Sequence, residues 1–404
     1  MSHTTSPLRL FYAAGPGDVV GSFRHFLQGR DDPAQTAVAY STQFFEACRQ
    51  TESLGLCVSS HDRPDTAHGQ QISARNMPRF LKHARGALWH GAHITYGLRL
   101  LHIAAAFQAD VAFISEDTTH FFIADLFRTR GIMPIPTLHN TLWTDTGPKS
   151  RLQSVILRAA RPYFSKHAIS ILSASRAIRQ QVEHLTDGEA QPIMEFLPLY
   201  RHDVFSDLPP PDPHCRPFRV LFAGRIEANK GIFDLVQAAA LLKDRGLPIA
   251  FDICGTGAAL PEVKRRVDNE RLGDIVQIHG HLSRPDMMDR LGASHVVAAP
   301  TTPDFNEGFN QSLSEAVLAG RPVIATAVNP ALEQVAAAAV VVPPYAPAAL
   351  ADAITDFVNT PDRYVELCHH AQSVAGVFRN PESSFQHMLL RAIHLAQTLR
   401  TRAL

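Results

Sequence analysis

The chain has 404 residues, 45% of them hydrophobic and 19% charged, and its 38 lysines and arginines balance 38 aspartates and glutamates. This composition is typical of a folded protein with two or three domains, and its zero net charge gives no general attraction to nucleic acid. The five cysteines show no metal-ligand spacing, the N-terminus has no signal sequence, and no apolar run is long enough to span a bilayer. We therefore expect a cytoplasmic protein without disulfides, whose contact with a membrane, if it has one, is peripheral.

The first half opens with a predicted strand at 8–13, followed by a loop that carries Gly15, Gly17 and Asp18. A strand, a glycine-bearing loop and a helix begin many doubly wound α/β domains. The glycines serve either a close approach of the backbone to a ligand or a simple turn, and their spacing is not the dinucleotide fingerprint G-x-G-x-x-G. Further strands are predicted at 36–40 and 56–60, with a helix at 43–53 and a mostly helical stretch at 75–107.

Two stretches of the first half, 66–109 and 146–182, contain basic residues and no acidic ones. The basic residues are Arg75, Arg79, Lys82, Arg85 and Arg99 in the first, and Lys149, Arg151, Arg158, Arg161, Lys166, Arg176 and Arg179 in the second. Such unopposed positive charge fits contact with anionic lipid or with a phosphorylated acceptor. The alternative is a solvated surface whose charge is offset by acids elsewhere in the fold.

Two predicted strands of the first half, 111–115 and 132–138, end in polar residues. Glu116 and Asp117 follow the first strand, and His139 follows the second. Because ligands of α/β sheets bind at the carboxyl ends of the strands, we expect these side chains in a crevice. For His139, one of 21 histidines, structural packing at a strand end is the alternative.

The proline-rich segment 208–217 divides the chain. So many prolines exclude a helix and a central strand, which predicts an interdomain linker between a first domain at 1–207 and a second at 218–378. In the second domain, strands are predicted near 218–223, 249–254, 275–279, 295–299, 322–326 and 339–342. Helical patterns alternate with them, which is typical of a parallel doubly wound sheet. The tail at 379–404 has apolar residues at helical spacing.

The stretch 307–324 carries the clearest chemical signal. Asn310 is predicted to cap a helix that begins at Gln311 and ends before a Gly-Arg-Pro sequence. Glu307 lies in the loop before this helix, and Glu315 lies about one turn inside it. The N-terminus of a helix favours an anion, and carboxylates on either side of it accept hydrogen bonds from sugar hydroxyls. The arrangement therefore predicts a sugar-nucleotide site.

These residues carry a resemblance to a known family. Glu307 and Glu315, with seven residues between them and Ala-x-x-Ala-Gly-x-Pro-Val-Ile after the second, resemble the E-x7-E motif of the retaining nucleotide-sugar glycosyltransferases of family 4. Upstream, Arg225 and Lys230 lie in a sequence that is similar to the family's G-R-x4-K-G. The resemblance is continuous from 218 to about 353 and patchier before the linker. It implies the α/β GT-B fold, two Rossmann-like doubly wound domains facing a central cleft.

The resemblance also implies a role for each matching residue. Arg225 and Lys230 would hold the donor diphosphate, supported by the amides of Asn310, Gln311, Ser312 and Leu313. Glu315 would bind the donor ribose, and the nucleobase would lie beside Gly280, His281 and Leu282. Glu307, with Gly308 and Phe309, would lie at the transferred sugar, and His139 would lie beside that sugar and the acceptor hydroxyl. Glu307 and His139 are thus the catalytic candidates, and the loop with Gly15, Gly17 and Asp18 would border phosphate or acceptor.

The implied reaction moves a sugar from a nucleoside-diphosphate-sugar to a hydroxyl of a sugar, a lipid-linked or another acceptor, with retention at the anomeric carbon. No metal and no cofactor are expected, because the two cations neutralise the departing diphosphate. The last helix would return to the first domain. Two segments depart from the family pattern: Val328-Asn329-Pro330 replaces a glycine-rich turn, and Pro198-Leu199-Tyr200-Arg201 replaces an asparagine-glycine turn.

Two alternatives remain at this point. A nucleotide-sugar epimerase of the same architecture would convert or release the sugar without an acceptor. A non-catalytic sugar-nucleotide-binding protein would keep Arg225 and Glu315 but lose the chemistry at Glu307 and His139.

Overall fold

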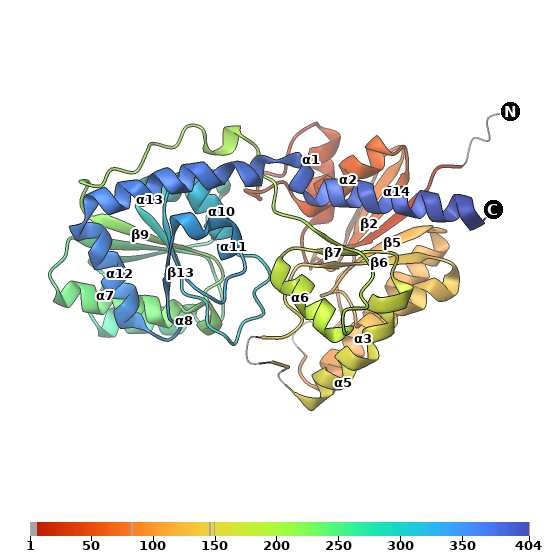
Figure 1. Cartoon of the computed structure of the whole chain (residues 1–404), viewed down its shortest axis with the longest axis horizontal. Helices are drawn as coiled ribbons and strands as arrows, with labels where there is room; N and C mark the ends of the chain where they lie inside the picture. The colour runs from red at the N-terminus through yellow and green to blue at the C-terminus, as the bar shows by residue number, and fades with distance from the viewer. Residues whose placement is uncertain (1–5, 82–83, 145–146, 149, 404) are drawn as a thin grey trace. The chain divides into compact units, whose positions relative to one another are not determined.

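The structure, a computed structural model, describes residues 6–81, 84–144, 147–148 and 150–403. The chain divides into two compact units (Figure 1). Unit 1 comprises Met1–Leu142, Pro148–Leu199 and Pro381–Leu404, and unit 2 comprises Trp143–Gly147 and Tyr200–Asn380. Among the described residues, no helix is both long and apolar enough to cross a membrane.

Unit 1 is built on an eight-stranded sheet with the order β3-β4-β2-β1-β5-β6-β7-β8. The strands are β1 (Arg9–Ala13), β2 (Leu54–Ser59), β3 (Asp65–His68), β4 (Ile72–Asn76), β5 (Val111–Ser115), β6 (Met133–Leu138), β7 (Ile171–Ser173) and β8 (Ile193–Glu195). Only β3 runs antiparallel to its neighbour. Because the chain continues from β1 to β2 on one side and reaches β5 on the other, the carboxyl edge between β1 and β5 is a topological switch point, where ligands of such sheets bind.

Helices flank this sheet (Figure 1). They are α1 (Val19–Leu27), α2 (Tyr40–Gln50), α3 (Ala87–Ala106), α4 (Phe121–Ala124), α5 (Arg151–Ala159), α6 (Arg176–Leu185) and α14 (Phe385–Ala403). Shorter helical turns are Asp125–Arg130 and Tyr163–His167.

The predicted strand at 36–40 is wrong. The backbone of Val38 bonds outside the sheet, because its N–H donates to the carbonyl of Leu199 at 2.8 Å. Its carbonyl accepts from Nε2 of Gln43, also at 2.8 Å. Because the N–H and the carbonyl of Val38 are both hydrogen-bonded in this way, they do not pair with a strand. The segment leads directly into α2, which begins at Tyr40.

The prediction of a mostly helical stretch at 75–107 is also partly wrong. Its first residues belong to β4, whose neighbour β3 forms the polar outer edge of the sheet. The helix α3 begins only after Gly86, whose φ of 59° is a left-handed conformation that glycine adopts without strain.

Unit 2 contains a six-stranded sheet with the order β11-β10-β9-β12-β13-β14, and all its neighbouring strands are parallel. The strands are β9 (Phe218–Ala223), β10 (Ile249–Cys254), β11 (Val276–Gly280), β12 (Val296–Ala299), β13 (Val323–Thr326) and β14 (Ala339–Val342). These confirm the predicted strands to within one residue at each end. The chain reaches β10 on one side of β9 and β12 on the other, so the switch point lies between β9 and β12.

The helices of unit 2 are α7 (Ile232–Asp244), α8 (Leu260–Asn269), α9 (Arg284–Ala293), α10 (Gln311–Leu318), α11 (Leu332–Val335), α12 (Pro347–Asn359) and α13 (Pro361–Val374). Short 3-10 turns lie at Ala228–Lys230 and Ala336–Ala338. The core is apolar: alternate residues of β9 and β10, such as Phe218, Val220 and Phe251, pack with the buried faces of α7 and α12. This packing fixes the edge of the sheet from which the loops after the strands extend.

The proline-rich segment 208–217 is bound to unit 2. The guanidinium of Arg321, which is fully buried, donates to the carbonyls of Pro209 (2.7 Å), Gly292 (2.5 Å) and Ser294 (3.2 Å), and also to that of Ala319. Burial lowers the pKa of Arg321, and the ring of carbonyl acceptors keeps the charge solvated.

The residues just before this segment are held in unit 2 as well. The hydroxyl of Tyr200 shares a hydrogen bond with Oγ of Ser314 at 2.9 Å. The backbone N–H of Tyr200 donates to the carbonyl of Phe378 at 2.9 Å. The structural boundary therefore lies between Leu199 and Tyr200, ahead of the prolines. Tyr200, for which no role was predicted, anchors the chain to α10.

The helix α14 belongs to unit 1 and lies beside α2 (Figure 1). Its first residue, Phe385, packs in an aromatic cluster with Tyr40 and Phe196, at ring-centroid distances of 5.1 and 4.9 Å. His139 completes the cluster, 4.6 Å from the ring of Tyr40 and 5.8 Å from Phe385. Burial among these rings lowers the pKa of His139 to about 4, and its Nε2 has no hydrogen-bond partner in the described part of the chain.

Replacing Arg321 by methionine should lower the free energy of unfolding by about 2–4 kcal/mol, because several buried carbonyls lose their donor. Urea unfolding followed by circular dichroism measures this loss. The matched control is Arg265→Met: Arg265 lies exposed on α8, paired with Glu262, and should change stability by less than about 0.5 kcal/mol. Equal stability of Arg321→Met and wild type would contradict the anchoring role.

Stability should fall between pH 6.5 and 4, in part because of His139. Since its folded-state pKa lies below the unfolded value, the unfolded chain takes up a proton first as the pH falls. The contribution of the neutral ring is complete above about pH 6.5 and decreases towards pH 4. His139→Phe should therefore reduce the stability loss between pH 7 and 5 by about 1–2 kcal/mol. Denaturant titrations at the two pH values test this, and an unchanged difference would show that folding does not lower the pKa of His139.

Candidate functional site

Three loops of unit 2 meet at the switch point between β9 and β12. The loop after β9 joins the loop after β10 through the N–H of Ile226, which donates to the carbonyl of Thr256 at 2.9 Å. It joins the loop after β12 through the carbonyl of Asn229, which accepts from the N–H of Thr302 at 3.0 Å. At Gly231, where φ is 72°, a Cβ atom would lie 1.8 Å from the carbonyl oxygen of Pro300. Only glycine allows these loops to approach so closely.

At the centre of these loops, Lys230 and Glu307 form a buried ion pair. Nζ of Lys230 donates to Oε2 of Glu307 at 2.6 Å, and the two side chains are 13% and 5% exposed. Thr301 adds a second donor, with Oγ1 3.3 Å from the same oxygen. Burial lowers the pKa of Lys230, and the carboxylate of Glu307 offsets this only in part. The structure thus joins the predicted diphosphate-binding lysine directly to the predicted donor-sugar carboxylate.

Arg225 lies on the open side of this pair. Its guanidinium lies 5.1 Å from the ring centroid of Phe305, and Nζ of Lys230 lies 4.0 Å from the same centroid. The side chain of Arg225 is 59% exposed, and its ion pair with Glu227 is long, at 3.4 Å. Phe305, which sequence reasoning missed, therefore keeps two cations close together while one of them stays accessible. Such a pair of cations suits a polyanionic ligand.

The helix α10 begins as predicted, with Asn310 as its N-cap. Oδ1 of Asn310 accepts from the N–H of Ser312 at 3.2 Å and from its Oγ at 2.7 Å. The N–H of Leu313 donates to the carbonyl of Asn310 at 3.2 Å. The amides of Ser312 and Leu313 are therefore already engaged in the first turn of the helix, which leaves the predicted anion site to the amides of Asn310 and Gln311.

Asn329 is a positioning residue that the sequence did not reveal. Its Oδ1 accepts from Nδ2 of Asn310 at 3.0 Å, and its own Nδ2 donates to the carbonyl of Ala299 at 3.0 Å. It thus ties the N-cap of α10 to the end of β12. Two more side chains beside the ion pair were missed: Oδ1 of Asn229 and Oδ1 of Asn306 are buried without a hydrogen-bond partner in the described chain. Unsatisfied buried acceptors at one edge suggest that a ligand donates to them.

The remaining predicted residues of unit 2 lie along the same sheet edge. Glu315 is half-buried within the second turn of α10, and Phe309 packs against Phe378 with a centroid distance of 6.0 Å. Gly280 ends β11, the outer strand beside β10, and its carbonyl accepts from the N–H of Gly255 at 2.7 Å. His281 is exposed directly after it. Gly308 directly precedes Phe309 in the loop before α10. Leu282 directly follows His281 in the loop after β11.

The switch point of unit 1 collects the polar residues predicted there. A Cβ atom at Gly15 would lie 2.9 Å from Oδ2 of Asp117, so glycine gives room to this carboxylate. The carboxylate of Glu116 accepts from the N–H of His139 at 3.0 Å and from Nδ2 of Asn140 at 2.7 Å. Burial and the neighbouring Asp117 raise the pKa of Glu116 to about 8. The edge therefore holds two adjacent, buried carboxyl groups, whose burial disfavours the ionised form of each.

Arg79 and His93, missed by sequence reasoning, extend this group. Arg79 donates to the backbone carbonyl of Asp117 and, at 2.9 Å, to Nε2 of His93. Because arginine only donates, the proton of His93 lies on Nδ1, which faces the carbonyl of Trp89 at 3.1 Å. Burial and Arg79 lower the pKa of His93 to about 4, so this ring stays neutral.

Asp18 caps α1 and is poorly suited to bind phosphate. Its Oδ1 accepts from the N–H of Gly21 at 2.8 Å and from Nδ2 of Asn76 at 2.7 Å. Partial burial opposes ionisation of this carboxyl, but these hydrogen bonds outweigh it and lower its pKa. A carboxylate that already occupies a helix N-terminus repels a phosphate. Gly17 lies beside it with open space around its Cα, which favours an acceptor over a phosphate at this loop.

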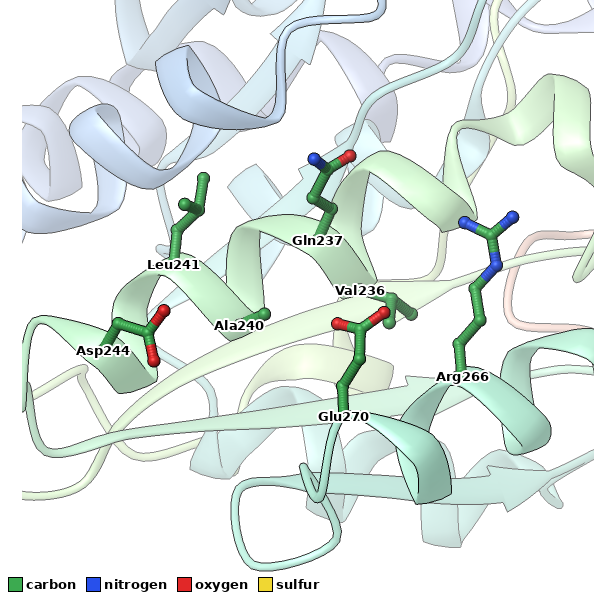
Figure 2. Close-up of a pocket in the computed structure, with 7 residues that line it drawn as sticks. All are labelled: Val236, Gln237, Ala240, Leu241, Asp244, Arg266 and Glu270. Atoms are coloured by element: carbon green, nitrogen blue, oxygen red, sulfur yellow. The ribbon is translucent and has the colours of Figure 1, made fainter.

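A separate pocket of about 430 Å³ lies on the helical face of unit 2 (Figure 2). Gln237, Leu241 and Asp244 line it from α7, and Arg266 and Glu270 line it from α8 and the residue after it. None of its lining residues belongs to the loops at the strand ends. It is therefore distinct from the site built around Lys230.

Residues 213–374 match the family model of the glycosyl transferases group 1. Alpha-D-kanosaminyltransferase of Streptomyces kanamyceticus is 29% identical over 154 residues, which are 38% of this chain and 39% of that protein. D-inositol 3-phosphate glycosyltransferase of Arthrobacter sp. (strain FB24) is 34% identical over 116 residues, 28% of this chain and 27% of that protein. The chain thus spans less than half the length of these curated relatives.

Solved structures match nearly the whole chain. Sucrose-phosphate synthase from Thermosynechococcus elongatus has a TM-score of 0.74 at 16% identity, with 98% of this chain and 100% of that chain covered. The E. coli trehalose-6-phosphate structure bound with UDP-2-fluoro glucose has a TM-score of 0.72 at 13% identity, with 96% and 99% covered. At these identities the similarity establishes the fold. The chain has the α/β GT-B fold of two Rossmann-like units, and residues 213–374 are similar to the glycosyl transferases group 1.

Proposed function

We propose that this protein transfers a sugar from a nucleoside-diphosphate-sugar to an acceptor hydroxyl, with retention of configuration, as an enzyme of glycosyltransferase family 4. The observation that carries the proposal is the buried pair of Lys230 and Glu307 at the switch point of unit 2, beside Arg225 and the N-terminus of α10. The cation suits the diphosphate of a nucleotide sugar. The carboxylate next to it suits the hydroxyls of the sugar that is attached to this diphosphate. The family match of the same residues and the names of the relatives support this assignment.

The donor would lie along the strand ends of unit 2. Arg225 and Lys230 bind the diphosphate together with the amides of Asn310 and Gln311, and Glu315 binds the ribose. Glu307 accepts hydrogen bonds from hydroxyls of the transferred sugar. The nucleobase lies against the turn at 280–282. When the glycosidic bond opens, negative charge grows on the leaving diphosphate, and the two fixed cations stabilise it without a metal.

The acceptor would lie at the strand ends of unit 1, near His139. Glu116, Asp117 and Arg79 lie at the same edge and offer both acceptors and donors to a hydroxylated molecule. The acceptor class is a sugar, a lipid-linked sugar or another hydroxyl compound. We further propose that the enzyme works in the cytoplasm, with unit 1 at the inner face of the membrane, where a lipid-linked acceptor is presented.

Diphosphate binding should depend on the two cations. Arg225→Ala and Lys230→Ala should each weaken the binding of a nucleoside diphosphate by about 1.5–3 kcal/mol, the range for a charge-assisted hydrogen bond. Calorimetry with uridine, guanosine and adenosine diphosphates measures it. Arg245→Ala is the matched control, because Arg245 pairs with Asp352 on the helical face of unit 2 and should leave affinity unchanged. Wild-type affinity in both site variants would exclude this diphosphate site.

Glu307 and His139 should act on turnover more than on binding. Glu307→Gln and His139→Ala should lower kcat by about 100-fold or more while the affinity for nucleoside diphosphate changes little. The assay follows diphosphate release from the best-bound nucleotide sugar across a panel of hydroxyl acceptors, with rates normalised to the folded fraction. Wild-type rates in both variants would place the reaction elsewhere. An isomerised donor formed without acceptor would indicate an epimerase instead.

A further inference from the structure

Unit 1 exposes a cluster of large apolar side chains that its own fold does not cover. Phe80 is 70% exposed and Leu88 is 64% exposed. Leu81, Trp89 and Leu98 are each more than a third exposed. We call this cluster the α3 patch; it consists of Phe80, Leu81, Leu88, Trp89 and Leu98. Leu88 and Leu98 lie on the outward face of α3 together with Thr95. Several exposed apolar side chains on one helix and the segment before it indicate an interaction surface.

A groove adjoins the α3 patch. It encloses about 470 Å³ and combines the apolar side chains of Met77, Leu98 and Ile103 with the guanidinium groups of Arg75 and Arg99. The guanidinium of Arg99 also lies 5.2 Å from the ring centroid of Phe80. The groove is therefore lined by both cationic and apolar groups. An amphipathic anion has the matching chemistry.

A second helix of unit 1 shows the same combination. On α5, Leu152 and Val155 are exposed, and Arg151 and Arg158 are exposed beside them. Both α3 and α5 pack against α4 and lie close together at one end of unit 1 (Figure 1). The apolar and basic residues thus recur on neighbouring helices rather than on one.

The charge of the two stretches that contain α3 and α5 indicates which kind of partner this surface binds. Neither 66–109 nor 146–182 contains an acidic residue. Some arginines of the second stretch are neutralised from outside it, as Arg161 is by Asp187 at 2.6 Å. Arg75 and Arg85 are both exposed, and in the described part of the chain neither forms an ion pair. The predicted basic residues Lys82 and Lys149 lie outside the described residues.

We propose that unit 1 docks on an anionic phospholipid bilayer through the α3 patch. Phe80, Leu88 and Trp89 enter the interface, while Arg75 and Arg85 contact lipid phosphates and the groove holds a headgroup. Binding of this type combines buried apolar area with attraction to anionic lipid, and tryptophan favours the interfacial region. This deepens, and rests on, the proposed location at the inner face of the membrane. The helix α5 extends the same surface.

The test uses the full chain with Trp143→Phe, so that Trp89 is its remaining tryptophan. Vesicles of phosphatidylcholine, with or without phosphatidylglycerol, are cosedimented with the protein, and the emission of Trp89 is recorded. We expect binding and a blue shift only with phosphatidylglycerol. The Phe80→Ser/Leu88→Ser variant should lower partitioning at least tenfold, and Arg75→Gln or Arg85→Gln should lower it about fivefold each. Leu152→Ser/Val155→Ser should show a smaller loss in the same direction.

The matched controls are Leu27→Ser, an exposed leucine of α1 outside the patch, and Arg265→Gln on α8, both of which should bind like the parent. Equal binding to vesicles without phosphatidylglycerol, or full binding by Phe80→Ser/Leu88→Ser, would overturn the proposal. Patch-dependent self-association in place of vesicle binding, seen by sedimentation, would overturn it as well. Nucleoside-diphosphate affinity is measured in every variant. Since it reports on unit 2, a failure of membrane docking with normal nucleotide binding leaves the donor site intact.

Discussion

The buried ion pair between Lys230 and Glu307 is the constraint on which the candidate site of unit 2 depends. Removing both charges from water is costly, and the attraction compensates only if the geometry is held closely. The two residues come from different loops, so the loops must be fixed against each other. The contact between Gly231 and Pro300 and the hydroxyl of Thr301 supply this fixation. A diphosphate bound at this site, as proposed, would meet a cation that is already oriented, with a carboxylate next to it.

Unit 2 was largely predictable because its signals are local. Its strands are short apolar runs bounded by turn residues, and the cap at Asn310 lies directly before the helix that it begins. Asn329 could not be found in this way. Its role arises from Thr326, three residues away at the end of β13, together with Asn310 and Ala299, which are distant in sequence. A family motif identifies the residues that meet a ligand, but not the ones that hold them in place.

Unit 1 was harder to predict, because its polar residues take their meaning from tertiary contacts. Val38 looks like part of a strand, yet Leu199 and Gln43 satisfy its backbone. Glu116 was expected at a crevice, but its hydrogen bond to the backbone of His139 depends on the pairing of β5 with β6. The prolines of 208–217 predicted an interdomain linker but not its contact with unit 2, where the carbonyl of Pro209 is one of the acceptors of the buried Arg321. Such partners are visible only in the folded chain.

The return of the chain to unit 1 has a consequence for synthesis on the ribosome. Residues Tyr200–Asn380 of unit 2 are synthesised before Phe385, so the segment that carries the candidate donor residues is made while unit 1 still lacks α14. Until then the aromatic cluster around His139 is open on the side that Phe385 fills. The surroundings of His139 therefore cannot be complete until after the candidate donor residues of unit 2 have been synthesised.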